Sequence, residues 1–162
     1  MKTLIPALLL VFTSLSTFAQ DQKASKSVYG EIFGPGFLSV NYDTRFTKKK
    51  DGFGMRVGFG YAPGIFSGDG FTIPVGLNYL IGKKKNFVEV GAGASYVHFS
   101  ASKDDGWFNT DGGSFVMAYG WIGYKYQPIN KGFTFRAGLC PVYDGVEFVP
   151  EYFGVSFGYA FK

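Results

Sequence analysis

The C-terminal stretch FGVSFGYAFK alternates strictly between two kinds of side chain. Its odd positions hold Phe153, Val155, Phe157, Tyr159 and Phe161, whereas the even positions from 154 to 160 hold only Gly, Ser and Ala. A period of two is the repeat of a β-strand, because successive side chains point to opposite faces of the sheet. The alternation therefore predicts a strand with one aromatic face and one nearly bare face.

The same alternation recurs along the chain. Three stretches repeat it without interruption: FGMRVGFGY, FTIPVGLNYLIG and FTFRAGLCP. Less regular versions cover residues 28–34, 38–46, 88–99 and 117–126. In the last of these, Met117, Tyr119 and Trp121 are out of phase with Ile122 and Tyr124, which predicts a bulge. The sequence thus predicts eight strands, or seven if residues 28–46 form one long strand.

The predicted connections alternate in length. Short, lysine-bearing turns (TKKKDG, GKKKN and QPINKG) alternate with longer loops (APGIFSGDG, SASKDDGWFNTDGG and DGVEFVPEY). A meander with short turns at one end and long loops at the other is typical of an outer-membrane barrel. The fold class predicted is therefore all-β, an eight-stranded antiparallel up-and-down transmembrane β-barrel.

The bare face decides which side of this barrel is turned outward. A soluble barrel would need a hydrated exterior, and glycine both weakens strands and covers no surface. A narrow eight-stranded lumen, in contrast, has room for little more than small residues and a few longer side chains. The apolar face is therefore predicted to meet lipid.

Charged residues within the strands agree with this direction. All but Glu31, whose strand has no clear phase, lie opposite the apolar set, and a lipid-facing Arg or Lys at mid-bilayer would cost roughly 2–4 kcal/mol. We interpret them as an ion-pair plug inside the lumen, with a relay or selectivity ring as the alternative. This lumen charge network comprises Glu31, Asp43, Arg45, Arg56, Glu89, Lys125 and Arg136.

Aromatic residues gather near the strand ends, as they do in the interfacial girdles of membrane barrels. The predicted girdle comprises Phe53, Tyr61, Phe71, Tyr79, Trp121, Tyr124, Tyr126, Tyr159 and Phe161.

The first 19 residues have the features of a secretory signal peptide. Lys2 precedes an apolar core, and Thr17-Phe18-Ala19 fits a cleavage site. Residues 20–162 then form a single domain. The single cysteine, Cys140, excludes an intrachain disulfide, and a formal net charge of +4 is too small to indicate nucleic-acid binding.

Taken together, residues 28–162 resemble the small eight-stranded outer-membrane β-barrels of the OmpA, OmpX and OmpW kind. The resemblance rests on pattern and not on an invariant motif. It implies a monomer in the outer membrane of a Gram-negative bacterium, in contact with lipopolysaccharide and other outer-membrane lipids. It also implies insertion by the barrel-assembly machinery, which reads a terminal Phe; here Phe161 is followed by Lys162.

With the periplasmic C-terminus that the resemblance implies, the lysine-rich turns face the periplasm and the acidic loops face outward. We expect the lysines to meet anionic headgroups of the inner leaflet, the alternative being that they only solvate the turns.

The function expected is structural or interactive, in a closed barrel that presents loops 64–70, 101–113 and 144–152 outward. A narrow transport path for small or hydrophobic compounds is the first alternative. A lipid A-modifying enzyme is the second, because His98 and Ser100 have the H-x-S spacing of outer-membrane deacylases. Glu89 is too far along the strand to complete a triad, so no catalytic residue is expected. No cofactor or metal is expected either, since the ligand pattern after Asp104 and Asp105 is incomplete.

Overall fold

The structure is a computed structural model that describes residues 25–62, 69–100 and 112–161. The predicted signal peptide and most of loops 64–70 and 101–113 lie outside these residues. Within the described ranges, no helix is long and apolar enough to span a membrane.

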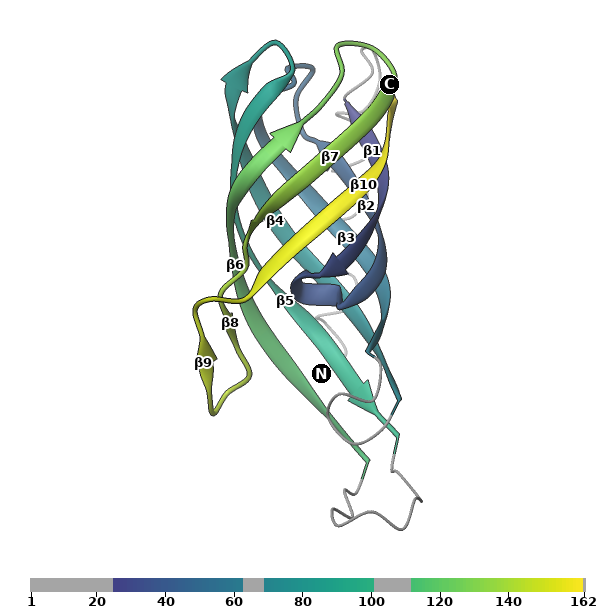
Figure 1. Cartoon of the computed structure of the whole chain (residues 1–162), viewed down its shortest axis with the longest axis vertical. Helices are drawn as coiled ribbons and strands as arrows, with labels where there is room; N and C mark the ends of the chain where they lie inside the picture. Colours follow the sequence, from purple (N-terminus) through teal and green to yellow (C-terminus); the bar gives the residue numbers. More distant parts are fainter. Residues whose placement is uncertain (1–24, 63–68, 101–111, 162) are drawn as a thin grey trace, which may run out of the picture.

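Eight long strands close into a barrel (Figure 1). They are β1 (Lys26–Phe33), β2 (Leu38–Arg45), β3 (Gly52–Ala62), β4 (Gly70–Lys83), β5 (Asn86–Phe99), β6 (Gly113–Tyr126), β7 (Gly132–Leu139) and β10 (Phe153–Phe161). Each pairs antiparallel with its neighbours, and β1 closes the ring by pairing with β10 from Lys26↔Phe161 to Phe33↔Gly154. The predicted fold class is confirmed. The seven-strand alternative is wrong, because the 3-10 turn η2 (Gly34–Gly36) separates β1 from β2.

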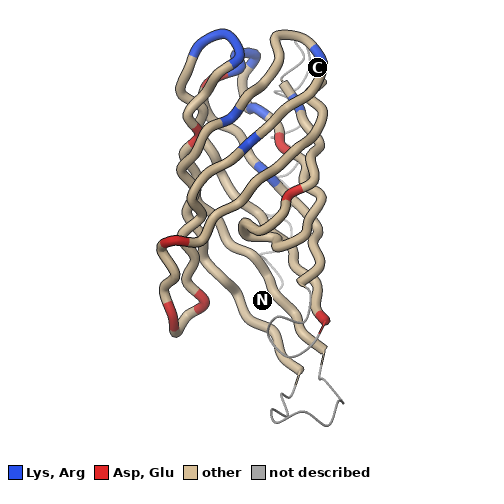
Figure 2. The backbone as a smooth tube through the Cα atoms, viewed as in Figure 1, with Lys and Arg blue, Asp and Glu red and all other residues tan. Residues whose placement is uncertain are grey.

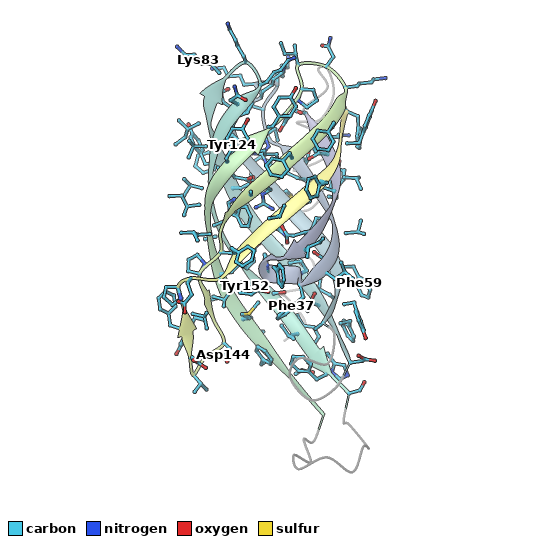
Figure 3. All side chains as sticks on the ribbon, viewed as in Figure 1. Phe37, Phe59, Lys83, Tyr124, Asp144 and Tyr152 are labelled. Atoms are coloured by element: carbon cyan, nitrogen blue, oxygen red, sulfur yellow. The ribbon has the colours of Figure 1, made fainter. Side chains whose placement is uncertain are left out.

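The two faces of each strand follow the sequence alternation. In β3, for example, Phe59 is 63% exposed on the outer face, whereas Arg56 is 1% exposed on the inner face. Figure 3 shows Phe59 and Tyr124 projecting from the outside of the barrel. The apolar face is thus the exterior, and the small and charged face is the interior.

The barrel wall has unequal heights. β4, β5 and β6 have 14 residues each, while β1, β2 and β7 have 8 and β10 has 9. Beyond the end of β7, the connection to β10 forms a small hairpin of β8 (Val142–Tyr143) and β9 (Phe148–Val149). β8 pairs with β6 at Ala118↔Tyr143, so this hairpin extends the low side of the wall.

The β1–β2 turn folds into the barrel. Gly34, Pro35 and Gly36 are all buried, and Thr72, an inward-facing residue of β4, donates its hydroxyl to the Gly36 carbonyl at 3.0 Å. The fold inward requires unusual backbone angles, with positive φ at Phe33, Gly34 and Phe37. The turn therefore lies across the interior at the mouth opposite the short turns.

The predicted bulge in residues 117–126 is wrong. The β5–β6 pairing runs without a break from Asn86↔Tyr126 to Phe99↔Gly113. Met117, Tyr119 and Trp121 therefore share the inner face with Lys125, and all four are buried. Tyr119 and Trp121 pack with Cys140 in a buried cluster inside the barrel.

Candidate functional site

All seven residues of the lumen charge network point into the barrel and are at most 2% exposed. Every barrel strand supplies a polar group to the network. The contributors are Glu31 of β1, Asp43 and Arg45 of β2, Arg56 of β3, Asn78 of β4, Glu89 of β5, Lys125 of β6, Arg136 of β7 and Ser156 of β10. The network therefore links side chains from all sides of the lumen.

Glu31 lies at one centre of the network. Its carboxylate accepts hydrogen bonds from Arg56 at 2.8 Å, from Arg136 at 3.0 Å and from the Ser156 hydroxyl at 3.1 Å. Arg56 also donates to the Asn41 side chain at 2.7 Å. A carboxylate with several charged and neutral donors is well satisfied in a buried position.

Asn78 joins the other two carboxylates, and Arg136 connects them to Glu31. The Asn78 amide nitrogen donates to Asp43 and to Glu89, both at 2.6 Å, while its oxygen accepts from Arg45 at 2.5 Å. Glu89 also accepts from Arg136 Nε at 2.7 Å. The sequence placed Asn78 on the inner face by phase, but nothing in the pattern revealed that an amide would bridge two acids.

Positive charge is in excess in the described lumen. The network holds four basic side chains but three carboxylates. Lys125 has the weakest attachment, because its Nζ lies 3.3 Å from Asp43 Oδ1 and makes no hydrogen bond. Burial of an incompletely neutralised cation is unfavourable, so the surrounding acids are important for stability.

Aromatic rings complete the interior. Trp121, at 3% exposure, stacks on the Arg136 guanidinium with 3.7 Å from Cζ to the ring centroid. Arg56 lies 5.8 Å from the ring centroids of both Tyr29 and Tyr119. The placement of Trp121 in the outer girdle is therefore wrong, because the β6 phase and a cation–π contact direct its ring inward.

Both ends of the charged layer are covered. Towards the short turns, Leu80 and Phe87 are buried on the inner face, and Gln127 donates a hydrogen bond to the Ser25 hydroxyl. Towards the opposite mouth, the inward turn lies against the network, since a Cβ on Gly34 would fall 2.8 Å from the Glu31 carboxyl group. Side chains and turn together occupy the described interior over its height.

The other predicted girdle residues lie on the outer face. Those near the short turns are Phe53, Tyr79, Tyr124, Tyr126, Tyr159 and Phe161, and those near the opposite end are Tyr61 and Phe71. Some form pairs, such as Phe53 with Tyr79, whose ring centroids are 4.7 Å apart. The rings therefore form two exterior groups separated by aliphatic residues.

His98 lies on the outer face near the acidic end. Its Nδ1 is 2.8 Å from the hydroxyl of Ser114, which also accepts a hydrogen bond from Tyr96 at 2.9 Å. The partner of His98 is thus Ser114 from the neighbouring strand, and not Ser100 as the H-x-S spacing suggested. The signal for this pairing is the strand register His98↔Ser114, which the sequence alone does not specify.

The β8–β9 hairpin is held by its own hydrogen bonds. Asp144 Oδ1 accepts from the backbone N–H groups of Glu147 at 2.7 Å and Val146 at 2.8 Å, and these bonds hold the pKa of its carboxyl group below the ordinary value. The hairpin presents Val146 at 93% exposure and Phe148 at 61%. It is an ordered outward projection whose tip carries both acids and apolar side chains.

Charges outside the lumen are segregated by end (Figure 2). The short turns carry a lysine collar, which we define as Lys48, Lys49, Lys50, Lys83, Lys84, Lys85 and Lys131. The described residues at the opposite end carry the acids Asp69, Asp144, Glu147 and Glu151. The barrel is therefore strongly polarised along its axis.

The sequence and the structure were compared with those of known proteins. No family model matches the sequence, and no curated protein matches it either. The crystal structure of the N-terminal β-barrel domain of Pseudomonas aeruginosa OprF superposes with a TM-score of 0.62 at 16% sequence identity, covering 88% of this chain and 98% of that one. The chain has the fold of a small outer-membrane β-barrel. At this level of sequence identity, the likeness to the OprF domain is one of fold.

Proposed function

We propose that this barrel is an integral outer-membrane protein that is closed to solutes and presents its longer connections at the cell surface. The observation that carries the proposal is the interior, where all eight strands contribute to one ion-pair and hydrogen-bond network. A network that joins every strand both fills the lumen and fixes the barrel around it. Its role is then to anchor the loops, in a structural or interaction protein.

The exterior supports insertion into a bilayer. Aliphatic side chains such as Val40, Val57, Val75 and Leu77 are exposed around the barrel, with aromatic rings toward both ends. An apolar band flanked by aromatic girdles is the exterior of a transmembrane barrel. The proposal includes outer-membrane lipids and lipopolysaccharide as neighbours, insertion by the barrel-assembly machinery, and a monomeric state.

A catalytic role is not part of the proposal. A serine nucleophile needs a base and a third group that orients the base. His98 and Ser114 make the first contact, but among the described residues no carboxylate bonds to His98, and the Tyr96 hydroxyl donates to Ser114 instead. We therefore propose that these three side chains form an interfacial hydrogen-bonded group.

Surface labelling tests the location and the direction of insertion. Val146→Cys places a thiol at the exposed hairpin tip, and Lys84→Cys places one in the opposite turn, while the native Cys140 is fully buried. On intact cells, a membrane-impermeant maleimide is expected to label the first variant and to label the second only after the outer membrane is permeabilised. Labelling of Lys84→Cys alone on intact cells would reverse the orientation.

Conductance in planar lipid bilayers tests closure. The purified barrel is expected to insert without a steady current above that of the bare membrane. A steady ohmic conductance in most insertions would contradict the closed lumen and would favour the narrow transport path.

A further inference from the structure

The short turns surround an open cup at one mouth of the barrel. The cup has a volume of about 440 Å³ and is lined by residues of all three turns, among them Lys48, Lys49, Lys83, Lys84, Phe87 and Ile129. Asp51 is the one acid in its lining. The cup therefore joins lysines that are far apart in sequence into one strongly positive rim above an apolar floor.

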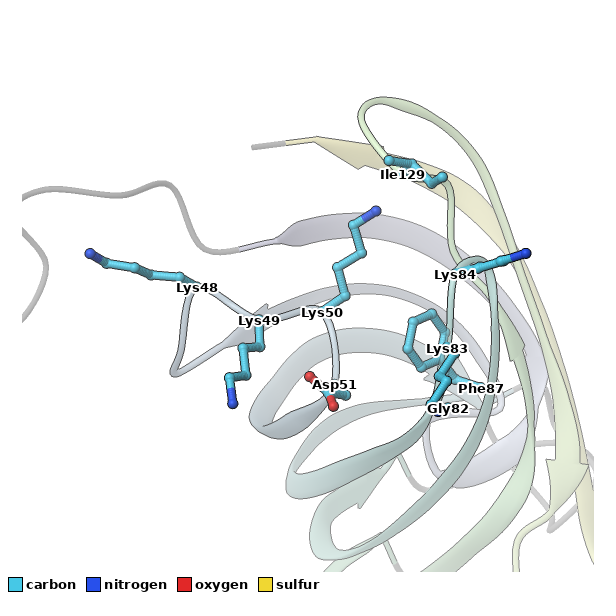
Figure 4. Close-up of a pocket in the computed structure, with 9 residues that line it drawn as sticks. All are labelled: Lys48, Lys49, Lys50, Asp51, Gly82, Lys83, Lys84, Phe87 and Ile129. Atoms are coloured by element: carbon cyan, nitrogen blue, oxygen red, sulfur yellow. The ribbon is translucent and has the colours of Figure 1, made fainter.

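The lysines of the cup diverge. In Figure 4, Lys48 and Lys84 extend away from the barrel on opposite sides, and Lys49 and Lys50 point in opposite directions. A site for one small anion would need ammonium groups that converge on a point. Diverging ammonium groups instead fit many phosphates arranged over a surface.

The collar also lies at a specific height relative to the apolar exterior. Phe53, Ile81 and Phe133 are each more than half exposed on the outer face, and each is two residues from a charged turn residue, namely Asp51, Lys83 and Lys131. At about 3.3 Å per strand residue, two residues span roughly 7 Å. The headgroup layer begins within this distance of the hydrocarbon core. Lysine stems can cover the edge of the apolar band while their ammonium groups reach the phosphates.

Among the described residues, Asp51 is the one acid of the short turns, so the collar keeps an excess of positive charge. The lumen network beneath it has its own excess of basic groups, and Arg45 of that network donates to the Gly52 carbonyl at the base of the β2–β3 turn, at 3.3 Å. The acids of the longer loops, as far as the structure describes them, lie at the opposite end (Figure 2). The positive potential at the turns is therefore directed toward the membrane surface at this end.

We propose that the lysine collar binds the phosphate groups of anionic phospholipids in the leaflet next to the short turns. The collar then holds a shell of acidic lipid around the barrel and fixes the depth of this end in the membrane. The inference rests on the proposed insertion into a bilayer, and it adds the class of lipid that the inserted barrel selects.

Spin-labelled lipids measure this selectivity directly. The barrel is reconstituted in phosphatidylcholine vesicles with trace spin-labelled phosphatidylglycerol or phosphatidylcholine, and the fraction of motionally restricted lipid is compared. At low salt the wild-type protein is expected to prefer phosphatidylglycerol, and loss of a single lysine contact is expected to weaken the association about fivefold. The preference should decrease at 0.5 M salt, because exposed charges are screened.

Three variants separate the collar from other causes. K48Q/K49Q/K83Q/K84Q is expected to lose the preference, K48R/K49R/K83R/K84R to keep it, and D144N/E147Q/E151Q at the acidic end to leave it unchanged. If the quadruple Gln variant is poorly folded, K83Q/K84Q and the salt titration of the wild-type protein provide the same comparison. Retention of the full preference in the Gln variants, or a preference insensitive to salt, would overturn the proposal.

Further measurements distinguish lipid from other anions and test the assumption that the barrel inserts into a bilayer. If millimolar inorganic phosphate releases phosphatidylglycerol, the lysines form a site for a small ion. If the Gln variant keeps its lipid preference but no longer binds isolated cell-wall sacculi, the ligand is an anionic polymer. Either result would overturn the lipid proposal. Heat-modifiable gel migration checks the folded barrel in each sample. A wild-type protein that does not enter vesicles contradicts the proposed function itself, whereas one that enters without lipid preference contradicts only the collar.

Discussion

Acidic residues inside and outside the lumen are expected to differ greatly in the consequence of losing a charge. Glu89 is fully buried and is held by Arg136 and Asn78, while Glu147 of the β8–β9 hairpin is exposed. Removing one partner of a buried ion pair leaves a desolvated charge behind, whereas exposed pairs contribute little. The two glutamates therefore form a matched comparison of interior and surface.

We predict that Glu89→Gln destabilises the barrel by about 3 kcal/mol or more, because Arg136 and Lys125 remain buried with one carboxylate fewer. Urea titration of the barrel in lipid vesicles, followed by gel migration, measures the change. Glu147→Gln is the control and is expected to stay within about 0.5 kcal/mol of the wild-type protein. Equal effects of the two substitutions would show that the network does not stabilise the barrel.

Residue-level prediction from the sequence succeeded where phase alone decides the direction of a side chain. Arg56 and Arg136 follow unbroken alternation, Asp43 lies in a less regular stretch, and all three point inward. Trp121 was assigned to the exterior because aromatic residues are common at membrane interfaces. Its interior position depends on stacking with Arg136, a contact between two strands that no local pattern contains.

At the scale of elements, the β1–β2 turn is the least regular part of the barrel. The sequence Gly34-Pro35-Gly36 indicates a turn, but the fold of that turn into the lumen is a tertiary feature. It depends on close approach to β3, where a Cβ on Gly60 would meet the carbonyl oxygen of Gly36 and lie 2.9 Å from Ser39 Cβ. Gly60 is therefore required for this approach.

We predict that Gly60→Ala displaces the inward turn and destabilises the barrel by about 1–3 kcal/mol through overpacking. Gly30→Ala is the matched control, because a Cβ on Gly30 has no atom within 4 Å. It is expected to change the free energy of unfolding by about 0.5 kcal/mol or less. The same urea titration compares the variants, and an equal response at both positions would contradict the steric role of Gly60.

The β8–β9 hairpin shows another limit of prediction at this scale. The sequence predicts a loop at DGVEFVPEY, whereas in the structure the two-residue strand β8 directly precedes this segment and the two-residue strand β9 lies within it. Such short strands carry no measurable period of two. They are fixed by the capping hydrogen bonds of Asp144 and by pairing of β8 with β6, which only the folded wall provides.

At the scale of the whole molecule, closure and polarity are the two features that follow most directly from sequence. Regular alternation with turns of alternating length predicts the meander, and the β1–β10 pairing completes it. The lysine and acidic connections then separate to opposite ends because successive connections of a meander do so. What the sequence could not supply is the unequal wall height and the way the interior is filled.

The proposed insertion requires that the rings on the exterior face hydrocarbon while the charged interior is shielded from lipid. Quenching of tryptophan fluorescence by brominated phosphatidylcholine tests it most directly, because the chain has 2 tryptophans. In Trp107→Phe, the remaining Trp121 reports the interior, and in Trp107→Phe/Trp121→Phe/Tyr124→Trp the new indole reports the exterior of the same strand. We expect strong quenching at position 124 and almost none at position 121; strong quenching at 121 with none at 124 would show that the two faces are reversed.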